Sequence, residues 1–432
     1  MISALSALRS RHPRIPGRAS LRELLGRPVP DPADLGSHEA DGALVDSSEA
    51  LQHLGAAGLR GASVRDVLRA DPRRYGSPPD PTALLRKRHA RHAELPPPSP
   101  GRRLRLLTFN VALLNRGYLG RRVVSPHGDL RREPLADAIF HGGWDVVLLQ
   151  EVWNDREASL FEARAGAAGY EVHTGARRYN HGLFVAVRAD WLGAEDRAEA
   201  LFGTQYHLEG APGPSIRRGF LRWTFQPPGL GRITLFDTHT SAFPWASTRR
   251  NLQARELGLA AADRPADEVV IVGGDLNAAL YYERNRRPNP NPRGKASTGW
   301  WANAASVPLL MHYGGLDDMH NLAAPALDVV RGSSLPGGLG RHPDVPLGRA
   351  GWCESCPQDT FTATDCNSLY FRQYGGTEFP ARIDHLLLRD PGRRVRVRDS
   401  EIVFTEPRDF GSAGRFELSD HYGVSVDIDV SA

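Results

Sequence analysis

The chain has 432 residues, of which 41% are hydrophobic and 24% are charged, a composition typical of a soluble globular protein. No stretch approaches the run of about 18 consecutive apolar residues that marks a membrane-spanning helix, and Arg9 comes too early for the apolar segment of a secretory signal. We therefore expect neither a transmembrane helix nor a signal peptide. This favours a cytoplasmic or peripheral membrane location, with secretion left open.

The formal net charge of +4 is distributed unevenly along the chain. Residues 1–103 contain 17 Arg or Lys and 11 Asp or Glu, so the remaining residues contain 37 basic and 39 acidic side chains. Proteins that bind duplex DNA usually carry a basic face. The slightly acidic larger part of the chain therefore argues against a dedicated nuclease and against a stable nucleic-acid partner.

The first region of the chain, residues 1–103, contains short helical patterns such as SLRELLG and ASVRDVLRAD. It ends in LPPPSPGRR, and such a proline run typically forms a stiff, extended linker. We expect a helical or partly disordered N-terminal extension over these residues. The remainder, residues 104–432, is expected to form one large domain.

From Leu104 onward, short apolar runs alternate with helical patterns. LRLLTFNV, DVVLLQEV, GLFVAVR, RITLFDTHT and EVVIVGGDLN are typical of strands, whereas PLADAIFHGG and STRRNLQARELGLAAAD are typical of helices. Turn-rich connections between GLFVAVR, RWTF and RITLF favour antiparallel pairing. The pattern predicts an α/β fold of two packed mixed, largely antiparallel sheets flanked by helices.

A long segment late in the chain breaks this pattern. Residues 284–352 are rich in Gly, Pro and Arg and exceed a plain connector, so we interpret them as a functional loop insertion or as disorder. Cys353, Cys356 and Cys366 follow, clustered within 14 residues. Three cysteines do not make a disulfide framework, and a zinc site would need a fourth ligand at matching spacing. Plain thiols or one local disulfide are therefore expected.

Several of the apolar runs end in polar or charged side chains. Such groups are costly to desolvate at the mouth of a buried strand unless they are paired or bound to a metal. Each of them alone fits a turn, a solvated strand end or a satisfied histidine, but together, in this order, they indicate one shared site. The residues are Asn110, Glu151, His239, Asp275, Asn277, Asp384, Asp420 and His421.

The residue types in this set predict metal-assisted chemistry on phosphate. Asn110 and Glu151 supply the amide and carboxylate oxygens that Mg²⁺ prefers, and a metal held in this way neutralises phosphate charge. A histidine beside a carboxylate can transfer protons near neutral pH. The chain has no GxxxxGK[ST] phosphate loop, no GxSxG elbow and no HExxH motif, which excludes several other enzyme classes.

The segments TFN, QEVW, DTHTS, GGDLN, RIDH and LSDHYGV, in this order between residues 108 and 424, resemble the endonuclease/exonuclease/phosphatase (DNase I-like) superfamily. The resemblance implies a four-layer α/β sandwich that cleaves phosphoesters with Mg²⁺, or with a related ion such as Mn²⁺ or Co²⁺. Within that superfamily, RGFLRWTF, THTS and SDHYGV resemble neutral sphingomyelinase and bacterial sphingomyelinase C.

The resemblance also implies a role for each residue of the set. Glu151 would bind the principal Mg²⁺, with Asn110 helping to hold the metal or the phosphate and Asp420 lying near the metal. His239 and Asn277 would contact the scissile phosphate and stabilise the charge that develops in the transition state.

Three further residues would handle the attacking water. Asp275 would orient this water or a second metal, and Asp384 would pair with His421, which would be the general base. Accounts within the superfamily divide the base role between the positions of Asp275 and His421, so both assignments stay open.

The substrate expected from these cues is a phospholipid at a membrane surface, with hydrolysis of sphingomyelin to ceramide and phosphocholine. Trp300 and Trp301, near Arg293 and Lys295, could contact the lipid interface, since indole favours the headgroup region, or could pack against the core. The alternatives are a nuclease, a phosphatase of phosphoinositides or other phosphomonoesters, and a non-catalytic binding module on the same scaffold. No oligomeric state is predicted.

Overall fold

The computed structural model describes the chain in ten segments, all beyond residue 100. The extension predicted over residues 1–103 lies outside them except for its last three residues, and Trp300, Trp301 and the three cysteines also lie outside. The division into extension and domain and the role of the two tryptophans stay predictions. The described residues are 101–118, 121–174, 182–193, 197–201, 218–242, 247–278, 306–323, 362–363, 367–370 and 382–432.

The first sheet contains six strands in the order β13-β16-β1-β4-β6-β5. It is mixed, because β1 pairs in parallel with β4 and antiparallel with β16. Every residue of β4 and β16 is buried, as expected for strands with both faces covered. The strands are β1 (Arg102–Asn110), β4 (Val146–Gln150), β5 (Tyr170–Thr174), β6 (Phe184–Arg188), β13 (Val395–Val403) and β16 (Gly423–Val430).

The second sheet also contains six strands, in the order β11-β12-β10-β9-β8-β7. β10 pairs in parallel with β9 and antiparallel with β12, so this sheet is mixed as well. All residues of β9 and β10 are buried. The strands are β7 (Arg197–Leu201), β8 (Phe220–Phe225), β9 (Ile233–His239), β10 (Val269–Asp275), β11 (Asp317–Asp318) and β12 (Asp384–Arg389).

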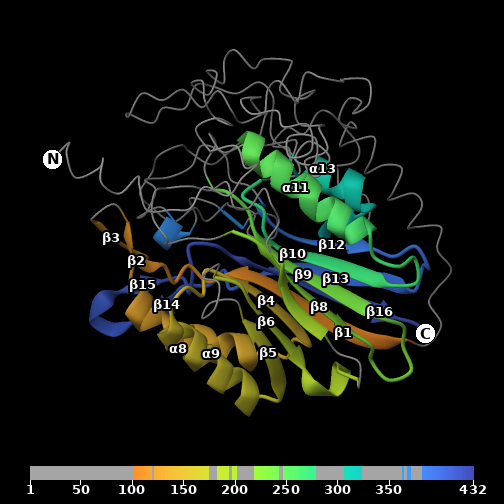
Figure 1. Ribbon diagram of the computed structural model, residues 1–432. Coiled ribbons are helices and arrows are strands. Elements are labelled where there is room, and N and C mark those ends of the chain that lie inside the picture. Colours follow the sequence, from red (N-terminus) through yellow and green to blue (C-terminus); the bar gives the residue numbers. More distant parts are fainter. Residues whose placement is uncertain are drawn as a thin grey trace, which may run out of the picture.

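Helices cover the outer face of each sheet, which gives four layers (Figure 1). The first sheet packs on α8 and α9 through a cluster that contains Phe109, Ile139 and Phe161. The second packs on α11 and α13 through a cluster that contains Leu257 and Val272. The helices are α8 (Gly128–Phe140), α9 (Asp155–Ala167), α11 (Ser247–Ala262), α13 (Ser306–Gly314) and α14 (Met319–Ala323).

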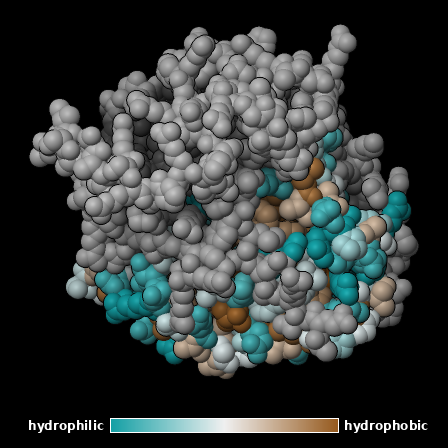
Figure 2. Space-filling view, in the orientation of Figure 1, coloured by the Kyte–Doolittle hydropathy of each residue, from teal (hydrophilic) through white to brown (hydrophobic). Residues whose placement is uncertain are grey.

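The main core lies between the two sheets. Leu106 and Leu148 of the first sheet belong to one buried cluster with Leu235 and Ile271 of the second, and each such side chain stabilises the fold by about 1.5–3 kcal/mol. Among the described residues, only Leu130 is an exposed large hydrophobic side chain. Figure 2 shows small hydrophobic groups among mostly hydrophilic described residues on the visible face. The predicted α/β sandwich of two mixed sheets flanked by helices is confirmed.

Two elements differ from the sequence prediction. The sequence pattern places the start of this helix at Pro134, since proline is favoured in a first turn. Helix α8 instead begins at Gly128, six residues earlier, and contains Pro134 in its interior. Within the predicted insertion, residues 306–323 form α13, β11 and α14. Leu310 and Met311 bury their side chains in the cluster beneath α11, so this part of the insertion belongs to the domain core.

Short elements complete the described chain. They are the hairpin of β2 (Asn115–Tyr118) and β3 (Arg121–Val124), the hairpin of β14 (Arg408–Asp409) and β15 (Arg415–Phe416), and the 3-10 turns Ala189–Trp191 and Gly411–Ala413. Within the described residues, no helix has both the length and the hydropathy needed to cross a membrane.

Strand ends from the second sheet lie side by side at one edge of the sandwich. Parallel strands β9 and β10 end together, with His239 opposite Asp275. Strand β12 runs the other way, so its first residue, Asp384, also lies opposite Asp275. In the first sheet, Asn110 ends β1 opposite Gln150 at the end of the parallel strand β4. The carboxyl ends of parallel strands are a common position for ligand sites in α/β folds.

Candidate active site

The second sheet contributes a row of three side chains. His239, Asp275 and Asp384 occupy neighbouring positions on β9, β10 and β12, and each is at most 2% exposed. Nε2 of His239 lies 3.1 Å from Oδ2 of Asp275, which places an N–H donor against the carboxylate. The backbone register of three strands therefore sets the spacing of this row.

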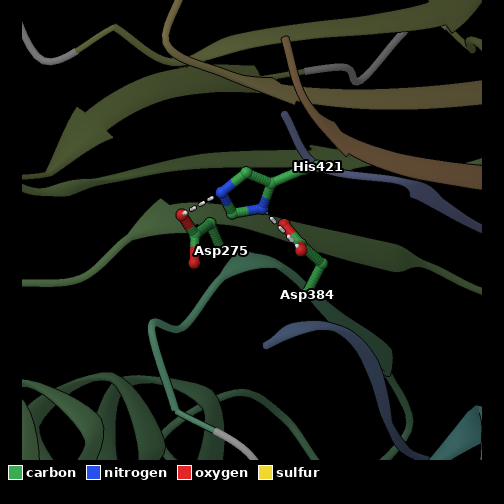
Figure 3. Close-up of side chains that lie close together, drawn as sticks. All are labelled: Asp275, Asp384 and His421. Atoms are coloured by element: carbon green, nitrogen blue, oxygen red, sulfur yellow. Dashed lines mark hydrogen bonds and ion pairs between the residues drawn. The ribbon is translucent and has the colours of Figure 1, made fainter. Parts of the chain in front are cut away.

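Two contacts join the first sheet to this row. Nδ2 of Asn110 donates to Oδ2 of Asp275 at 2.9 Å, and Nδ1 of His421 lies 2.9 Å from Oδ2 of Asp384. The other ring nitrogen of His421, Nε2, lies 3.9 Å from Oδ2 of Asp275. The imidazole thus lies between two carboxylates that come from adjacent strands (Figure 3).

The carboxylates around His421 set its protonation. Burial lowers the pKa of His421, but the charges of Asp384 and Asp275, and then of Asp420, bring this pKa well above its ordinary value. Burial raises the pKa of Asp275, but the charges of His239 and His421 bring it below its ordinary value. These shifts favour the ionised form of Asp275 and the protonated form of His421, whose Nδ1 faces Asp384.

Glu151 and Asp420 have the donor set that fits a divalent cation. Glu151 directly follows β4 and is half-buried, and Asp420 is buried. Burial and the nearby carboxylate of Glu151 raise the pKa of Asp420, as expected for two like charges in a site of low dielectric constant. A divalent cation with oxygen ligands relieves this repulsion. The ligand atoms of Asp275, Asp384 and His421 also lie within 4.8 Å of one another.

The two asparagines are oriented by the same carboxylate and by their own turns. Oδ1 of Asn110 accepts from the amide of Ala112 at 3.0 Å, and a carbonyl oxygen keeps a second lone pair for a further partner. The backbone N–H of Asn277 donates to Oδ1 of Asp275 at 2.8 Å, and the side-chain Nδ2 of Asn277 donates to the carbonyl of Thr240 at 3.3 Å. Asp275 therefore ties Asn110 and Asn277 into one network.

Two residues of the set hold a left-handed backbone. Glu151 has φ 66° and Asn277 has φ 46°. Asparagine tolerates this region, but glutamate rarely adopts it, and such a conformation costs about 1–3 kcal/mol. The turn after β4 therefore holds the Glu151 carboxylate in place at the expense of local backbone strain, a pattern common at functional sites.

All eight residues predicted from the sequence lie at this edge of the sandwich. Hydrogen bonds or ion pairs connect six of them, and charge interactions connect Glu151 to Asp420 and Asp420 to His421. Their chemical roles stay predictions.

The sequence analysis missed three residues that hold the site together. Arg131 is fully buried and donates to carbonyls beside the site. Oγ of Ser419 donates to the carbonyl of Asn110 at 2.6 Å. Oγ1 of Thr362 accepts from the amide of Asp384 at 3.2 Å. None ends an apolar run except Ser419, which stands beside Asp420, so only Ser419 carried a usable signal.

Solved structures with similar folds come from several organisms. Sphingomyelinase C from Streptomyces griseocarneus shares 22% identity over 76% of this chain and 99% of its own, with a TM-score of 0.49. D. rerio TDP2, complexed with single strand DNA product, shares 17% identity over 76% and 99%, with a TM-score of 0.48. A Bacteroides thetaiotaomicron protein of the endonuclease/exonuclease/phosphatase family shares 15% identity over 77% and 100%, with a TM-score of 0.45. These scores do not separate the substrate classes.

A family match covers the whole site. No curated protein matches the sequence, but the sequence profile described as the endonuclease/exonuclease/phosphatase family matches residues 107–421. This range begins in β1 and ends at His421, and it confirms the resemblance drawn from the motifs. Enzymes of this family are hydrolases of phosphodiester bonds and generally depend on a divalent metal. The chain belongs to the endonuclease/exonuclease/phosphatase family.

Proposed function

We propose that this protein is a Mg²⁺-dependent phosphodiesterase that hydrolyses a phospholipid headgroup ester, as a sphingomyelinase C does. The observation that carries the chemistry is the buried cluster in which Asn110, at the end of β1, and His421, before β16, meet Asp275 and Asp384 of the second sheet. The segments RGFLRWTF, THTS and SDHYGV and the slightly acidic charge of residues 104–432 support a lipid substrate over a nucleic acid.

The metal half of the site supplies charge neutralisation. Glu151 and Asp420, with Asn110 beside them, would hold a divalent cation, which would supply charge neutralisation of the phosphate and of the leaving oxygen. Mg²⁺ suits these oxygen ligands, and Mn²⁺ and Co²⁺ are substitutes to test. His239 and Asn277 contact the scissile phosphate and stabilise the charge of the transition state.

The other half moves the proton. Asp275 orients the water, and the 3.9 Å between its Oδ2 and Nε2 of His421 allows one water oxygen to contact both groups. Asp384 holds Nδ1–H of His421, so that Nε2 is the atom that accepts the proton. Asp420 is one of the carboxylates that raise the pKa of His421.

The reaction then balances as a hydrolysis. The water oxygen bonds to phosphorus in line with the bond that breaks, and its proton passes to Nε2 of His421. The leaving oxygen takes up a proton from the solvent to give the lipid alcohol, the phosphorylated headgroup is released, and Nε2 of His421 returns the proton of the attacking water to the solvent. Pre-positioning of water and phosphate supplies most of the rate in such chemistry.

One parallel assay tests the proposal. The purified full chain is incubated with Mg²⁺ or with EDTA on sphingomyelin vesicles, phosphatidylcholine vesicles, plasmid DNA and inositol phosphates. We expect Mg²⁺-dependent release of phosphocholine from sphingomyelin vesicles, lost in EDTA. Nicking of DNA or release of inorganic phosphate from inositol phosphates, without lipid turnover, would overturn the substrate assignment. No turnover of any of the four would overturn the enzyme assignment.

A further inference from the structure

Arg131 in helix α8 is a buried cation that makes an unusual number of backbone contacts. Its side chain is fully buried, and Nε donates to the carbonyl of Pro126 at 2.9 Å. Nη1 donates to the carbonyls of Val111, at 3.2 Å, and Leu418, at 2.5 Å. Nη2 donates to the carbonyl of Ala112 at 2.6 Å. Four of the five N–H donors of an arginine are thus directed at main-chain oxygens.

Three of the four acceptors belong to two distant segments that carry site residues. Val111 and Ala112 directly follow Asn110, and Leu418 comes two residues before Asp420. One guanidinium therefore joins the turn after β1 to the turn before β16. The same two segments are also joined where Oγ of Ser419 donates to the carbonyl of Asn110.

The charge of Arg131 also acts on the candidate metal ligands. Burial lowers the pKa of Arg131 to about 10, while the charges of Asp420 and Glu151 oppose that fall. The guanidinium is therefore charged at neutral pH. It lowers the pKa of Asp420, against the raising effects of burial and of Glu151. Arg131 is a fixed positive charge close to both carboxylates.

Replacing this group leaves a specific defect. A lysine keeps the charge but has no planar fork with which to reach carbonyls of two segments at once. A buried carbonyl without a donor is destabilising, so the two turns would shift until their oxygens find other donors. Asn110 and Asp420, which lie on these turns, would shift with them.

We propose that Arg131 is a positioning residue that holds Asn110 and Asp420 in the geometry needed to bind the divalent cation. The inference rests on the proposed metal-dependent function but not on the identity of the substrate. It differs from a general packing role because it predicts a loss of cation affinity in a chain that is still folded. Loss of an outer residue that orients metal ligands typically weakens metal affinity about 10–100-fold.

The test compares two adjacent arginines. Arg132, whose side chain is 12% exposed, makes an i,i+3 ion pair at 2.7 Å with the exposed carboxylate of Asp129, so Arg132→Lys is the matched control for Arg131→Lys. Mn²⁺ binding to the full chain is measured by calorimetry without any substrate, and turnover is then measured against Mg²⁺ concentration. We expect Arg131→Lys to weaken Mn²⁺ affinity at least about tenfold and to require more Mg²⁺, while Arg132→Lys behaves as the wild type.

Several outcomes would overturn the inference. It fails if folded Arg131→Lys binds Mn²⁺ with wild-type affinity, if Arg132→Lys shows the same loss, or if the wild type binds no Mn²⁺. Should Arg131→Lys fail to fold, Ser419→Ala removes the second link between the same turns, and wild-type Mn²⁺ affinity in that variant would contradict the inference. Weaker Mn²⁺ binding together with turnover of DNA alone would overturn the lipid substrate and leave the role of Arg131 standing.

Discussion

The two sheets supply the candidate site in different ways. The second sheet places His239, Asp275 and Asp384 on neighbouring strands, where backbone hydrogen bonds set their spacing. From the first sheet, Asn110 ends a strand, but Glu151 and the SDH segment lie on turns outside the strands. Their positions depend on side-chain contacts such as those of Arg131 and Ser419. We therefore expect the first half of the site to be more sensitive to substitutions outside it.

The largest effect on turnover is expected from His421, which contacts Asp275 and Asp384 of the second sheet. His421→Ala removes the group that takes the proton of the attacking water, and loss of such a group lowers turnover about 10²–10⁴-fold. The measurement is the turnover number on the best substrate, with circular dichroism and Mn²⁺ binding as controls. Turnover within a few-fold of the wild type would mean that His421 is not the base and would leave Asp275 as the candidate.

A buried ion pair in the second sheet tests whether backbone register alone holds that half. Oδ1 and Oδ2 of Asp318 each lie 3.1 Å from Arg382, and Oδ2 lies 3.0 Å from Nδ1 of His385. Arg382 and His385 flank Asp384. Removing one partner of a buried pair costs about 3–5 kcal/mol, so we expect Asp318→Asn to lower the melting temperature by roughly 10 °C.

The same variant should keep its turnover at temperatures where it is folded, because the strand register still sets the position of Asp384. The control is Asp190→Asn, which removes an exposed ion pair with Arg102 and should change stability by less than about 1 kcal/mol. If folded Asp318→Asn lost as much turnover as variants of Asp384 do, Asp318 would be shown to orient Asp384 directly.

The pH profile of turnover in Asp384→Asn tests two effects of Asp384 on His421, namely its charge and its orientation of the imidazole ring. The charge of Asp384, next after the opposing effect of burial, raises the pKa of His421. Asp384→Asn therefore lowers that pKa, and the acidic limb of the turnover profile, where the base becomes protonated, moves to lower pH. We also expect turnover at the optimum to fall, since the ring loses its orienting acceptor. An acidic limb that moves to higher pH would contradict the pairing.

The smallest effect concerns the strained turn after β4. Glu151 has φ 66°, a region that glycine adopts at little cost and other residues do not. Both Glu151→Gly and Glu151→Ala should lose cation binding, but the glycine variant should be more stable by about 1 kcal/mol. Chemical denaturation of the two variants measures the difference. Equal stability, or a more stable alanine variant, would show that the turn carries no strain.

Sequence reasoning found the strand ends because their signal is local. LLTFN and VVIVGGDLN combine an apolar run with a polar terminus, and each pattern is complete within a few residues. The contact between Asn110 and Asp275 joins residues 165 positions apart, so periodicity could suggest a shared site but not which side chains would touch. The family resemblance supplied the expected role of each residue and the pairing of Asp384 with His421.

Residues whose role depends on the tertiary structure were beyond local patterns. Arg131 and Arg132 are adjacent and identical in type, yet Arg131 donates to main-chain carbonyls beside the site and Arg132 pairs with the exposed carboxylate of Asp129. Only the packing of helix α8 on the turns after β1 and before β16 distinguishes them. The helix α13 was hidden for a related reason, since its apolar residues are flanked by long segments rich in Gly and Pro.

The pairing of the first and last strands has a consequence for biosynthesis. Arg102 at the start of β1 lies opposite Val430 at the end of β16, and His421 lies two residues before β16. Chains emerge from the ribosome N-terminus first. Strand β1 therefore lacks its antiparallel partner, and the candidate site lacks His421, until the residues of β16 have emerged. A nascent chain of this topology cannot assemble the site while it is shorter than that.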